Sequence, residues 1–450
     1  NMNILNYIWH GFHFTNQIPY RFAFIFSFVL VTAAFRAFDI LLQKGIKIYH
    51  FFLMLICPAA VFALSYYSQG DEFAFKDGFK NSVIISGAFF LIFIAAKIFP
   101  FKNQKVRNSL LSLAVTVIVI CEFAGNAQLG IDTVSTTGYY EYPTKNAPVQ
   151  TLLSDVRMQD DSEFYRLEMT ETYTLNDSAL YGYYGLSQFS SSANVSVTKF
   201  MKKLGLYAAE AGNRYYYRLS TPVVNSLLGL KYIIKKNGSL NTEEMALKHR
   251  NVTDNVHIYE NQYPLSLGFM MDSDILNISE SGGANPFEYQ NELMMRATGI
   301  RESIYTPQPV SEAEYNGLEV TRNGMGSFSF RCTSDDEPET SGELPTATYT
   351  FDGVKDSYLY GYAGCTGGCC DNIVIKCGDA TIDSGKLIEN YPLVFPMGNA
   401  QEDETSTVSL SPKEDTESGN FRLSVYALSR KVFEKAYDAL ADEQLNIDNF

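Results

Sequence analysis

Basic residues are scarce in this sequence, and several common catalytic motifs are missing from it. The 450 residues include 35 Lys and Arg against 50 Asp and Glu, which leaves a formal net charge of -15 at pH 7. Nucleic-acid binding needs clustered Lys and Arg to neutralise phosphates, so a nucleic-acid partner is not expected. The chain also contains no Gly-rich phosphate loop ending in Lys-Ser or Lys-Thr, no His-Glu-x-x-His and no Gly-x-Ser-x-Gly. The common nucleotidase and hydrolase mechanisms are therefore excluded.

Four long apolar runs lie close together in the first part of the chain. They cover residues 22–42, 46–67, 83–99 and 110–123. A bilayer core needs roughly 17 to 25 helical residues, so the first two runs are long enough and the last two are at or just below the limit. A secretory signal would show one short apolar region, and the helices of a soluble bundle would each show a polar face. The sequence therefore predicts four transmembrane helices over residues 22–124, preceded by an outer loop over residues 1–21.

The distribution of charge predicts how these helices are oriented. Residues 1–124 hold ten Lys or Arg and five Asp or Glu, whereas residues 125–450 hold 25 and 45. The links after the first and third runs are rich in Lys, and the link after the second run is mildly acidic. The positive-inside rule places the Lys-rich links in the cytoplasm. We therefore expect residues 1–21 and the long acidic body after residue 124 to lie outside the cell membrane.

The acidic body contains two regions with different sequence patterns. Residues 125–304, which begin with a linker, alternate helical and strand patterns, which predicts an α+β module. Residues 305–450 contain short runs separated by Gly, Asp, Ser and Thr, which is typical of a β-sandwich, and end in a helix. The predicted fold class is a multi-pass α-helical membrane segment followed by an extracytoplasmic α+β module and a β-sandwich. Expected helices cover residues 149–158, 195–204, 223–228, 286–296 and 430–445, and expected strands cover residues 164–170, 231–234, 256–259, 265–270, 327–332, 346–351, 357–362, 372–376, 407–410 and 421–426.

Four of the seven cysteines form a cluster. Cys365, Cys369, Cys370 and Cys377 flank a turn at residues 366–368. In an oxidising space outside the membrane, disulfides across a hairpin with this turn are the leading interpretation. Zinc ligation and free thiols remain alternatives, although the paired Cys-x-x-Cys spacing of zinc sites is absent. No metal and no cofactor is predicted.

The loop before the first apolar run combines histidines, aromatic rings and a basic residue. His10 and His13 are three residues apart and can meet on one helical face, and Arg21 lies where the apolar run begins. Three interpretations are open for this loop: an interfacial aromatic belt, a contact with lipid phosphate or an acceptor, and a metal site without an evident third ligand. Residues 272–274, Asp-Ser-Asp, could likewise hold a metal-bound nucleotide, but a polar turn is the simpler interpretation.

Tyrosines cluster twice in the α+β module. Residues 181–184 include three tyrosines and precede Ser187 and Gln188, and residues 215–217 are three tyrosines in a row. Sugars bind by ring stacking combined with hydrogen bonds, so these clusters can face a glycan. Rings also fill β cores, and packing is the other interpretation.

Several segments together resemble one family. The chain is similar to the bacterial YfhO family of polytopic membrane proteins in these stretches, taken in order: HGFHFTNQIPYRFAF, DSALYGYYGLSQFSS with FMKKLGL, STPVVNSLLGLKYII, YENQYPLSLGFM and PFEYQNEL. The resemblance thins after about residue 306, and the cysteine cluster is not part of it. It implies further spans before Asn1 and an anchor after Phe450.

The resemblance also implies an activity. Such proteins have a glycosyltransferase C-type architecture, which moves a sugar from an undecaprenyl-phosphate donor to a cell-envelope polymer such as lipoteichoic acid. The catalytic acid of that architecture lies in an early outer loop that no residue here matches, so the catalytic residues are unknown. What the resemblance carries over is a set of candidate substrate-binding residues near the donor phosphate or acceptor: His10, His13, Asn16 and Arg21.

The expected function is therefore part of an integral membrane glycosyltransferase that uses a polyprenyl-phosphate sugar donor. Its expected partners are membrane lipid, that donor and an envelope glycopolymer acceptor. A membrane-tethered glycan-binding or scaffold protein without chemistry is the alternative from another class. A transporter is a third interpretation, but the apolar runs show few of the polar or broken helices that it would need.

Overall fold

A computed structural model shows two compact units, Asn1–Tyr139 and Tyr140–Phe450. Each unit is a body of its own, and the description below applies within each. The structure describes residues 3–14, 23–69, 77–99, 101–134, 145–162, 164–209, 212–243, 246–279, 285–324, 326–333, 345–365, 373–378, 380–383, 393–398, 404–412 and 416–445.

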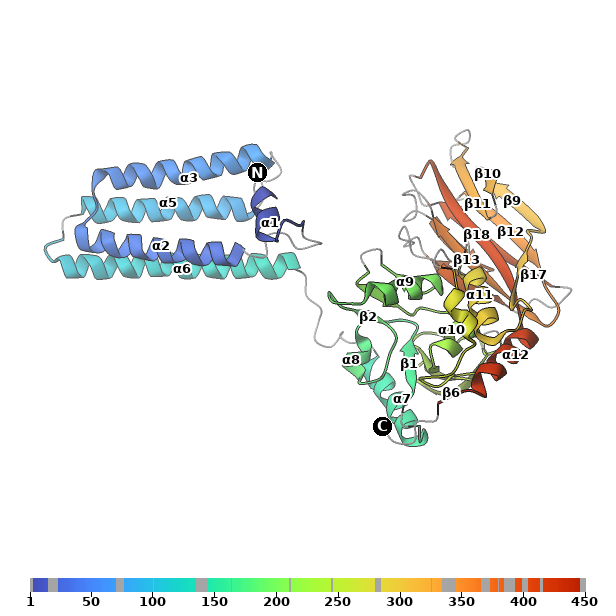
Figure 1. Cartoon of the computed structure of the whole chain (residues 1–450). Helices are drawn as coiled ribbons and strands as arrows, with labels where there is room; N and C mark the ends of the chain where they lie inside the picture. Colours follow the sequence, from blue (N-terminus) through green and yellow to red (C-terminus); the bar gives the residue numbers. More distant parts are fainter. Residues whose placement is uncertain are drawn as a thin grey trace. The chain divides into compact units, whose positions relative to one another are not determined.

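The first unit is helical (Figure 1). Its helices are α1 Asn3–Trp9, α2 Ala23–Lys44, α3 Ile48–Gln69, α5 Asp77–Ile98 and α6 Gln104–Val134. Three of them, α2, α5 and α6, are long and apolar enough to cross a membrane, and in α3 the apolar part within the described residues is the shorter stretch Ile48–Leu64. The prediction of a multi-pass helical membrane segment is thus confirmed, with three helices of spanning length in the described chain.

Helix α6 is longer than the sequence predicted. The expected apolar run ends at residue 123 and a linker was expected from residue 126, but the helix continues to Val134. Polar side chains in this extension bond within the helix, because the Nε2 of Gln128 donates to Asp132 at 2.8 Å and the hydroxyl of Thr133 donates to the carbonyl of Leu129 at 2.7 Å. The expected start of the linker is therefore wrong.

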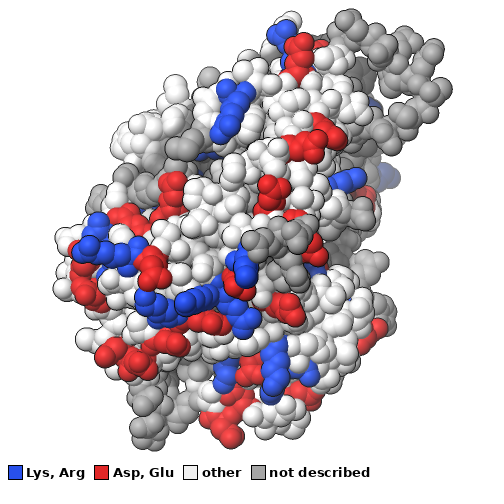
Figure 2. All heavy atoms as spheres, turned by 90° about the vertical axis from the view of Figure 1, so that its right-hand side faces the viewer, with Lys and Arg blue, Asp and Glu red and all other residues white. Residues whose placement is uncertain are grey.

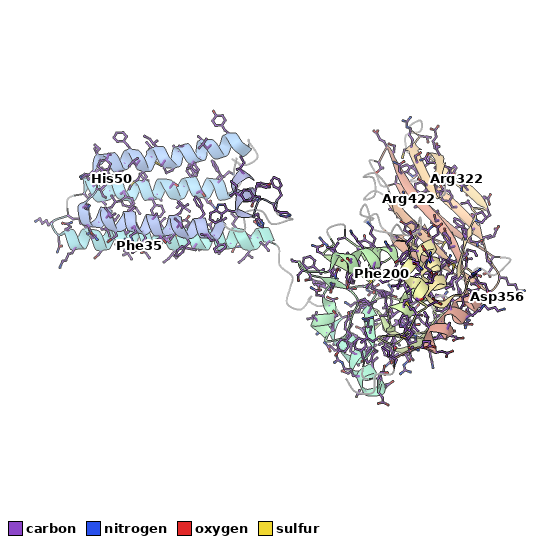
Figure 3. All side chains as sticks on the ribbon, in the orientation of Figure 1. Phe35, His50, Phe200, Arg322, Asp356 and Arg422 are labelled. Carbon is purple, nitrogen blue, oxygen red and sulfur yellow. The ribbon has the colours of Figure 1, made fainter. Side chains whose placement is uncertain are left out.

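Aromatic rings hold these helices together. The rings of Phe38 and Phe93 join α2 to α5 at a centroid distance of 6.2 Å, and the rings of Phe62 and Phe79 join α3 to α5 at 5.4 Å. Other apolar side chains point outward; Phe35, labelled in Figure 3, is 70% exposed. Helices that are apolar on their outer faces are stable in lipid, where such faces need no polar cover.

The second unit begins with an α+β module whose main sheet has the strand order β1-β5-β7-β6. Helix α7 Asn146–Gln159 covers this sheet and buries Val149, Leu152 and Val156 against Leu167 and Ile234. The strands are β1 Arg166–Met169, β5 Leu230–Lys235, β6 Leu247–Thr253 and β7 Val256–Asn261, with β1 parallel to β5 and the other pairs antiparallel. The further elements are α8 Asp177–Tyr181, β2 Gln188–Phe189, α9 Val195–Lys203, β3 Tyr207–Ala208, β4 Arg214–Tyr216, α10 Pro222–Leu227, the 3-10 helix Ser273–Asn277 and α11 Pro286–Thr298.

One expected strand of this module is not formed, and one observed edge strand was not expected. The predicted strand at residues 265–270 is only an isolated bridge between Phe269 and Gln444. Strand β6, by contrast, was not predicted. It is the edge strand, and its residues after Leu247 are exposed or half-buried, so no alternation of apolar and polar residues marks it.

Two antiparallel sheets form the β-sandwich (Figure 1). One has the order β10-β11-β18-β13-β16, with β8 paired to β18, and the other has the order β15-β14-β17-β12-β9. Buried rings such as Phe328, Tyr349, Phe351 and Phe395 fill the space between the sheets. The strands are β8 Tyr305–Gln308, β9 Glu312–Asn316, β10 Leu318–Gly324, β11 Ser327–Cys332, β12 Thr346–Asp352, β13 Ser357–Cys365, β14 Ile373–Cys377, β15 Ala380–Asp383, β16 Leu393–Gly398, β17 Thr405–Pro412 and β18 Ser418–Ser429.

The last helix, α12 Arg430–Ala441, packs with the α+β module rather than between the two sheets. Its buried residues Phe433, Ala436 and Leu440 lie in one hydrophobic core with Leu293 and Tyr289 of α11. This core also contains the sandwich residues Tyr358, Tyr360, Val394, Tyr426 and Leu428. The two parts of the body therefore share a core.

The predicted cysteine hairpin is wrong. Strand β13 pairs with β16 and β18, whereas β14 pairs with β15 and β17, so the two strands belong to different sheets. Cys369 and Cys370 lie outside the described residues. The Sγ of Cys377 lies 3.9 Å from the carbonyl of Met397. The disulfides themselves remain a prediction.

Gly361 offers a test of the sandwich core. A Cβ at this position would lie 2.3 Å from the ring of Phe395, which is buried directly opposite on β16. Because the ring cannot move away within a packed core, we expect Gly361→Ala to lower the free energy of unfolding by about 1–3 kcal/mol. Gly364→Ala on the same strand is the control, since its Cβ would make an ordinary contact at 3.6 Å with the hydroxyl of Tyr362. Equal thermal unfolding curves for the two variants would contradict the packing described.

Asp160 offers a test of how α7 is fixed to the sheet. Its carboxylate lies 2.8 Å from the Nζ of Lys231 and accepts a hydrogen bond from the hydroxyl of Tyr232 at 2.7 Å. Burial raises the pKa of Asp160, but hydrogen bonds from Lys231, Ser162 and Tyr232 outweigh this effect and lower it to about 2. The contact therefore stabilises the fold above about pH 4 and is lost as the pH falls towards 2.

We accordingly expect Asp160→Asn to cost roughly 1 kcal/mol at pH 6 and less at pH 3, measured by thermal unfolding. The neighbouring exposed residue gives a control variant, Asp161→Asn, which should behave as the unchanged protein at both pH values. A deficit for Asp160→Asn that is the same at pH 6 and pH 3 would show that the ion pair does not form.

Candidate functional site

The predicted loop site begins with a capped helix end. Helix α1 ends at Trp9, and the N–H of Phe12 donates to the carbonyl of Tyr7 at 2.9 Å while the N–H of Gly11 donates to Ile8 at 3.2 Å. Gly11 has a φ of 68°, and the rings of Tyr7 and Phe12 lie 6.0 Å apart. These are the hydrogen bonds and the apolar contact of a Schellman motif.

This cap changes the interpretation of the two histidines. His10 is the last residue of the helical turn, whereas His13 follows two residues with positive φ, so they do not share a helical face. His10 is half-buried and His13 is exposed. Asn16 and Arg21 lie outside the described residues. The structure therefore does not place His10 and His13 on one helical face, and the role of all four candidates stays a prediction.

A second candidate site is built around one buried carboxylate in the α+β module. Glu168 on β1 is buried, and its Oε2 accepts the backbone N–H groups of Leu186 and Ser187, both at 2.7 Å. Its Oε1 accepts the N–H of Met169 at 3.1 Å and the hydroxyl of Tyr183 at 3.4 Å. Burial raises the pKa of the Glu168 carboxyl, and the hydrogen bonds from the backbone act against this rise. Burial also raises the pKa of the Tyr183 hydroxyl, which therefore stays protonated and donates.

Further side chains fix the same loop to its neighbours. The amide of Asn176 makes two hydrogen bonds with the backbone of Phe189, at 2.9 and 3.2 Å. The hydroxyl of Ser187 accepts the N–H of Tyr217 at 2.9 Å. Gly185 has no space for a side chain, because a Cβ would lie 2.8 Å from the Cβ of Ser178. The backbone of residues 182–189 is thereby held in one path.

This loop forms one wall of a cavity of about 500 Å³. Arg166 of β1, Gln188 of β2 and Tyr215 of β4 supply polar groups, and Val197 and Met201 of α9 supply an apolar side. Helix α9 also carries Phe200, labelled in Figure 3. Ligand sites in proteins typically have volumes of roughly 300–1,000 Å³ and combine apolar walls with a few polar groups.

Aromatic rings lie beside the residues that line this cavity. The rings of Phe164 and Tyr184 lie 4.8 Å apart, and Tyr184 is 62% exposed. Phe189, next to Gln188, is 38% exposed and lies under the guanidinium of Arg214 at 5.7 Å. By contrast, Tyr181 is buried in the core. The tyrosine cluster at residues 181–184 therefore contributes both to packing and to an exposed aromatic surface.

The Asp-Ser-Asp segment at residues 272–274 has a structural role. Asp272 caps the 3-10 helix by accepting the N–H of Asp274 at 2.8 Å, and Asp274 pairs with Arg296 at 3.0 Å. The hydrogen bond from Asn277 and the charge of Arg296 lower the pKa of Asp274. The Asp-Ser-Asp segment is thus a capped turn. Within the described residues, no group of three or more His, Cys, Asp or Glu could hold a metal ion.

The histidines that lie close together are ones that the sequence analysis did not single out. The Nε2 of His249 lies 3.2 Å from the Nδ1 of His257 across strands β6 and β7. Burial together with the nearby His249 and Lys145 lowers the pKa of His257. A hairpin with histidines on one face would have been the signal, but β6 carries no alternation that identifies it as a strand.

A comparison with family models identifies the family of this chain. The family model for the bacterial membrane protein YfhO matches residues 1–450. The chain belongs to the YfhO family. The resemblance inferred from the sequence segments is thereby confirmed. No curated protein matches the chain.

Similarity to solved structures is weak. The arabinofuranosyltransferase AftD from Mycobacteria matches with a TM-score of 0.20 and 10% identity, over 77% of this chain and 40% of AftD. The CBM36-1 domain of a xylanase from the hindgut metagenome of Trinervitermes trinervoides matches with a TM-score of 0.18 and 14% identity, over 27% of this chain and 95% of the domain. The exo-beta-1,3-galactanase of Phanerochaete chrysosporium with galactose matches with a TM-score of 0.19 and 10% identity, over 40% of each chain.

Glu168→Gln tests the loop that lines the cavity. The amide of Gln would present a donor where Glu168 now accepts backbone N–H groups, so one set of hydrogen bonds must break at a cost of about 1–3 kcal/mol. We expect faster hydrogen exchange of the Leu186 and Ser187 amides in this variant. Glu319→Gln is the control, because Glu319 is exposed on β10. Because the Gln oxygen can replace either carboxylate oxygen, unchanged exchange at residues 169, 186 and 187 together would show that Glu168 does not fix the loop.

Proposed function

We propose that this YfhO family protein is part of an integral membrane glycosyltransferase that moves a sugar from a polyprenyl-phosphate donor to a cell-envelope polymer. The polymer is of the lipoteichoic acid type, and the large polar body recognises it as the acceptor. The observation that carries the proposal is the cavity beside Glu168, which is lined by polar side chains. The exposed rings of Tyr184 and Phe189 are next in sequence to lining residues. Sugars are bound by such combinations of stacking and hydrogen bonding.

The membrane unit supports the donor half of this proposal. A polyprenyl-phosphate sugar is confined to the bilayer, so its enzyme must hold a site at the membrane surface. Loop residues after α1 precede the apolar helix α2, and Trp9, Phe12 and Phe14 are exposed there. Exposed rings of this kind favour the interface between lipid and water. His10, His13, Asn16 and Arg21 are proposed to lie near the donor phosphate, with Arg21 as the residue best suited to pair with it.

The distribution of charge supports placing the body outside the membrane. Lys44 ends α2, and Lys102, Lys105 and Arg107 lie between α5 and the first turn of α6. We propose that α3 crosses the membrane as α2, α5 and α6 do, in which case these two links fall on the same side. Basic links favour the cytoplasm, so the body after α6 is proposed to be extracytoplasmic.

A second candidate, a glycan-binding protein without chemistry, is favoured by the state of Glu168. Its two carboxylate oxygens accept four hydrogen bonds from the protein, so it is poorly suited to act as a general base. Under this alternative the cavity holds the envelope polymer and the transfer is carried out by another protein.

The exposed rings give the test of the proposed function. We expect Tyr184→Ala and Phe189→Ala each to weaken binding of envelope glycan fragments by about tenfold, because each removes a stacking surface of roughly 1 kcal/mol or more. The measurements are calorimetric titration of the detergent-solubilised protein and incorporation of labelled sugar into the polymer by membranes that contain the complete protein.

Tyr315→Ala on the edge strand β9 is the matched control, because its ring is exposed but far from the cavity in the fold. Loss of both binding and incorporation supports the transferase. Loss of binding in a protein whose unchanged form incorporates no sugar supports the glycan-binding alternative. Unaltered binding in both cavity variants contradicts the use of this cavity for glycans.

A further inference from the structure

Local charge around the cavity differs from that of the whole protein. The chain carries a net charge of -15, and acidic and basic side chains are interspersed over the face shown in Figure 2. Between Ser178 and Leu219, however, there are five basic residues and one acid. The bases are Lys199, Lys202, Lys203, Arg214 and Arg218, and the acid is Glu210. This segment contributes α9, β2 and β4, which line the cavity.

Arg166 is the charged group of the cavity itself. Its Nη1 donates to the carbonyl of Leu228 at 2.6 Å, and its guanidinium lies 5.9 Å from the ring centroid of Phe164. Within the described chain, no acidic side chain pairs with Arg166, and its Nε and Nη2 donate to no protein acceptor. Burial lowers the pKa of this guanidinium, which reflects the cost of holding the charge away from water. Arginine nonetheless stays charged at neutral pH.

The remaining N–H donors of Arg166 determine the geometry of the chemical group that it can bind. Nε and Nη2 form one edge of the planar guanidinium, and two parallel N–H groups on one edge match two oxygens of a carboxylate or phosphate. Tyr215 lies beside the guanidinium, where the positive charge acts to lower the pKa of its hydroxyl while burial raises it to a greater extent. The amide of Gln188 lines the same cavity and offers further donors.

Glu168 cannot serve as the missing counterion. It lies two residues from Arg166 on β1, but its carboxylate accepts hydrogen bonds from Leu186, Ser187, Met169 and Tyr183. Its charge is therefore spread over these donors and it makes no contact with Arg166 among the interactions of the described residues. A half-buried cation that opens on a cavity and has no acidic partner in the described part of the chain is a site for an anion.

We infer that the cavity binds an anionic group of a glycan, with the Nε–Nη2 edge of Arg166 paired to two oxygens of that group and Tyr215 and Gln188 beside it. The inference rests on the proposed function, because it names the charge of the glycan that the cavity takes. Carboxylate and phosphate both have the required oxygens. The sugar ring that carries the anionic group lies against the exposed rings of Tyr184 or Phe189.

Three trisaccharides of one backbone test this inference: one neutral, one ending in a uronate and one ending in a phosphate. Titrated calorimetrically into the full chain in a neutral detergent, an anionic ligand is expected to bind at least tenfold more tightly than the neutral one. A tighter uronate identifies a carboxylate as the natural group, and a tighter phosphate identifies a phosphate. The preference should fall as salt is raised.

Arg166→Gln removes the charge and should lower the affinity for the anionic ligands to that for the neutral ligand. Arg166→Lys keeps the charge without the planar edge and should retain a smaller, salt-sensitive preference. Arg322→Gln is the control, since Arg322 lies on β10 of the sandwich, away from the cavity (Figure 3). Unchanged thermal unfolding establishes that each variant is folded.

The outcomes separate this inference from the proposed function. Equal binding of the three trisaccharides, or a preference that survives in Arg166→Gln, overturns the anion site and leaves glycan recognition intact. Failure of the unchanged protein to bind any of the three overturns both.

Discussion

The buried carboxylate of Glu168 is the interaction on which the candidate site depends. A carboxylate inside a sheet is costly unless several donors surround it, and here the donors are the backbone N–H groups of Leu186, Ser187 and Met169 and the hydroxyl of Tyr183. Because the acceptor belongs to β1 and most of the donors belong to the following loop, the loop can take only one path. That path brings Gly185 against Ser178 and leaves Tyr184 and Phe189 exposed.

The two parts of the body are stabilised in different ways. The sandwich relies on rings packed between its sheets, such as Phe328 of one sheet and Tyr349 of the other at 5.2 Å, and its interior needs few polar contacts. The α+β module instead contains buried polar residues that find partners. The hydroxyl of Thr221 donates to Gln290 at 2.8 Å, and the amide of Asn261 donates to the carbonyl of Leu230 at 2.8 Å. Polar networks of this kind orient side chains precisely because each member must find a partner. A binding cavity is therefore better placed in the module than in the sandwich.

Patterns in the sequence predicted the elements whose burial is one-sided. Helices α7, α9 and α11 and the sandwich strands β11, β12 and β17 show the expected periodicity and lie close to the predicted ranges. The almost fully buried helix α10 also lies close to its predicted range. Edge strand β6 was missed because exposure removes the alternation, and the hairpin between β13 and β14 was wrong because their connection passes from one sheet to the other. Local patterns carry no information on which sheet a strand joins. The sequence did contain a signal for the role of Glu168, because this acid is flanked by apolar residues in a short strand. A buried acid in such a strand needs hydrogen-bond donors from elsewhere in the chain.

Acidity of the body and a cationic cavity are compatible for a physical reason. At physiological ionic strength, charges on the surface are screened beyond about 8 Å, so the many exposed carboxylates act weakly on a ligand in contact with Arg166. Within the cavity the surroundings are less polar than water, and the pairing of Arg166 with an anion is correspondingly stronger. The acidic surface disfavours loose adsorption of any polyanion, while the proposed pairing with Arg166 would favour an anionic group that fits the cavity. Selectivity for one anionic ligand would then come from two effects together: repulsion of anions by the acidic surface and complementarity of the cavity to the ligand. Neither effect would provide this selectivity alone.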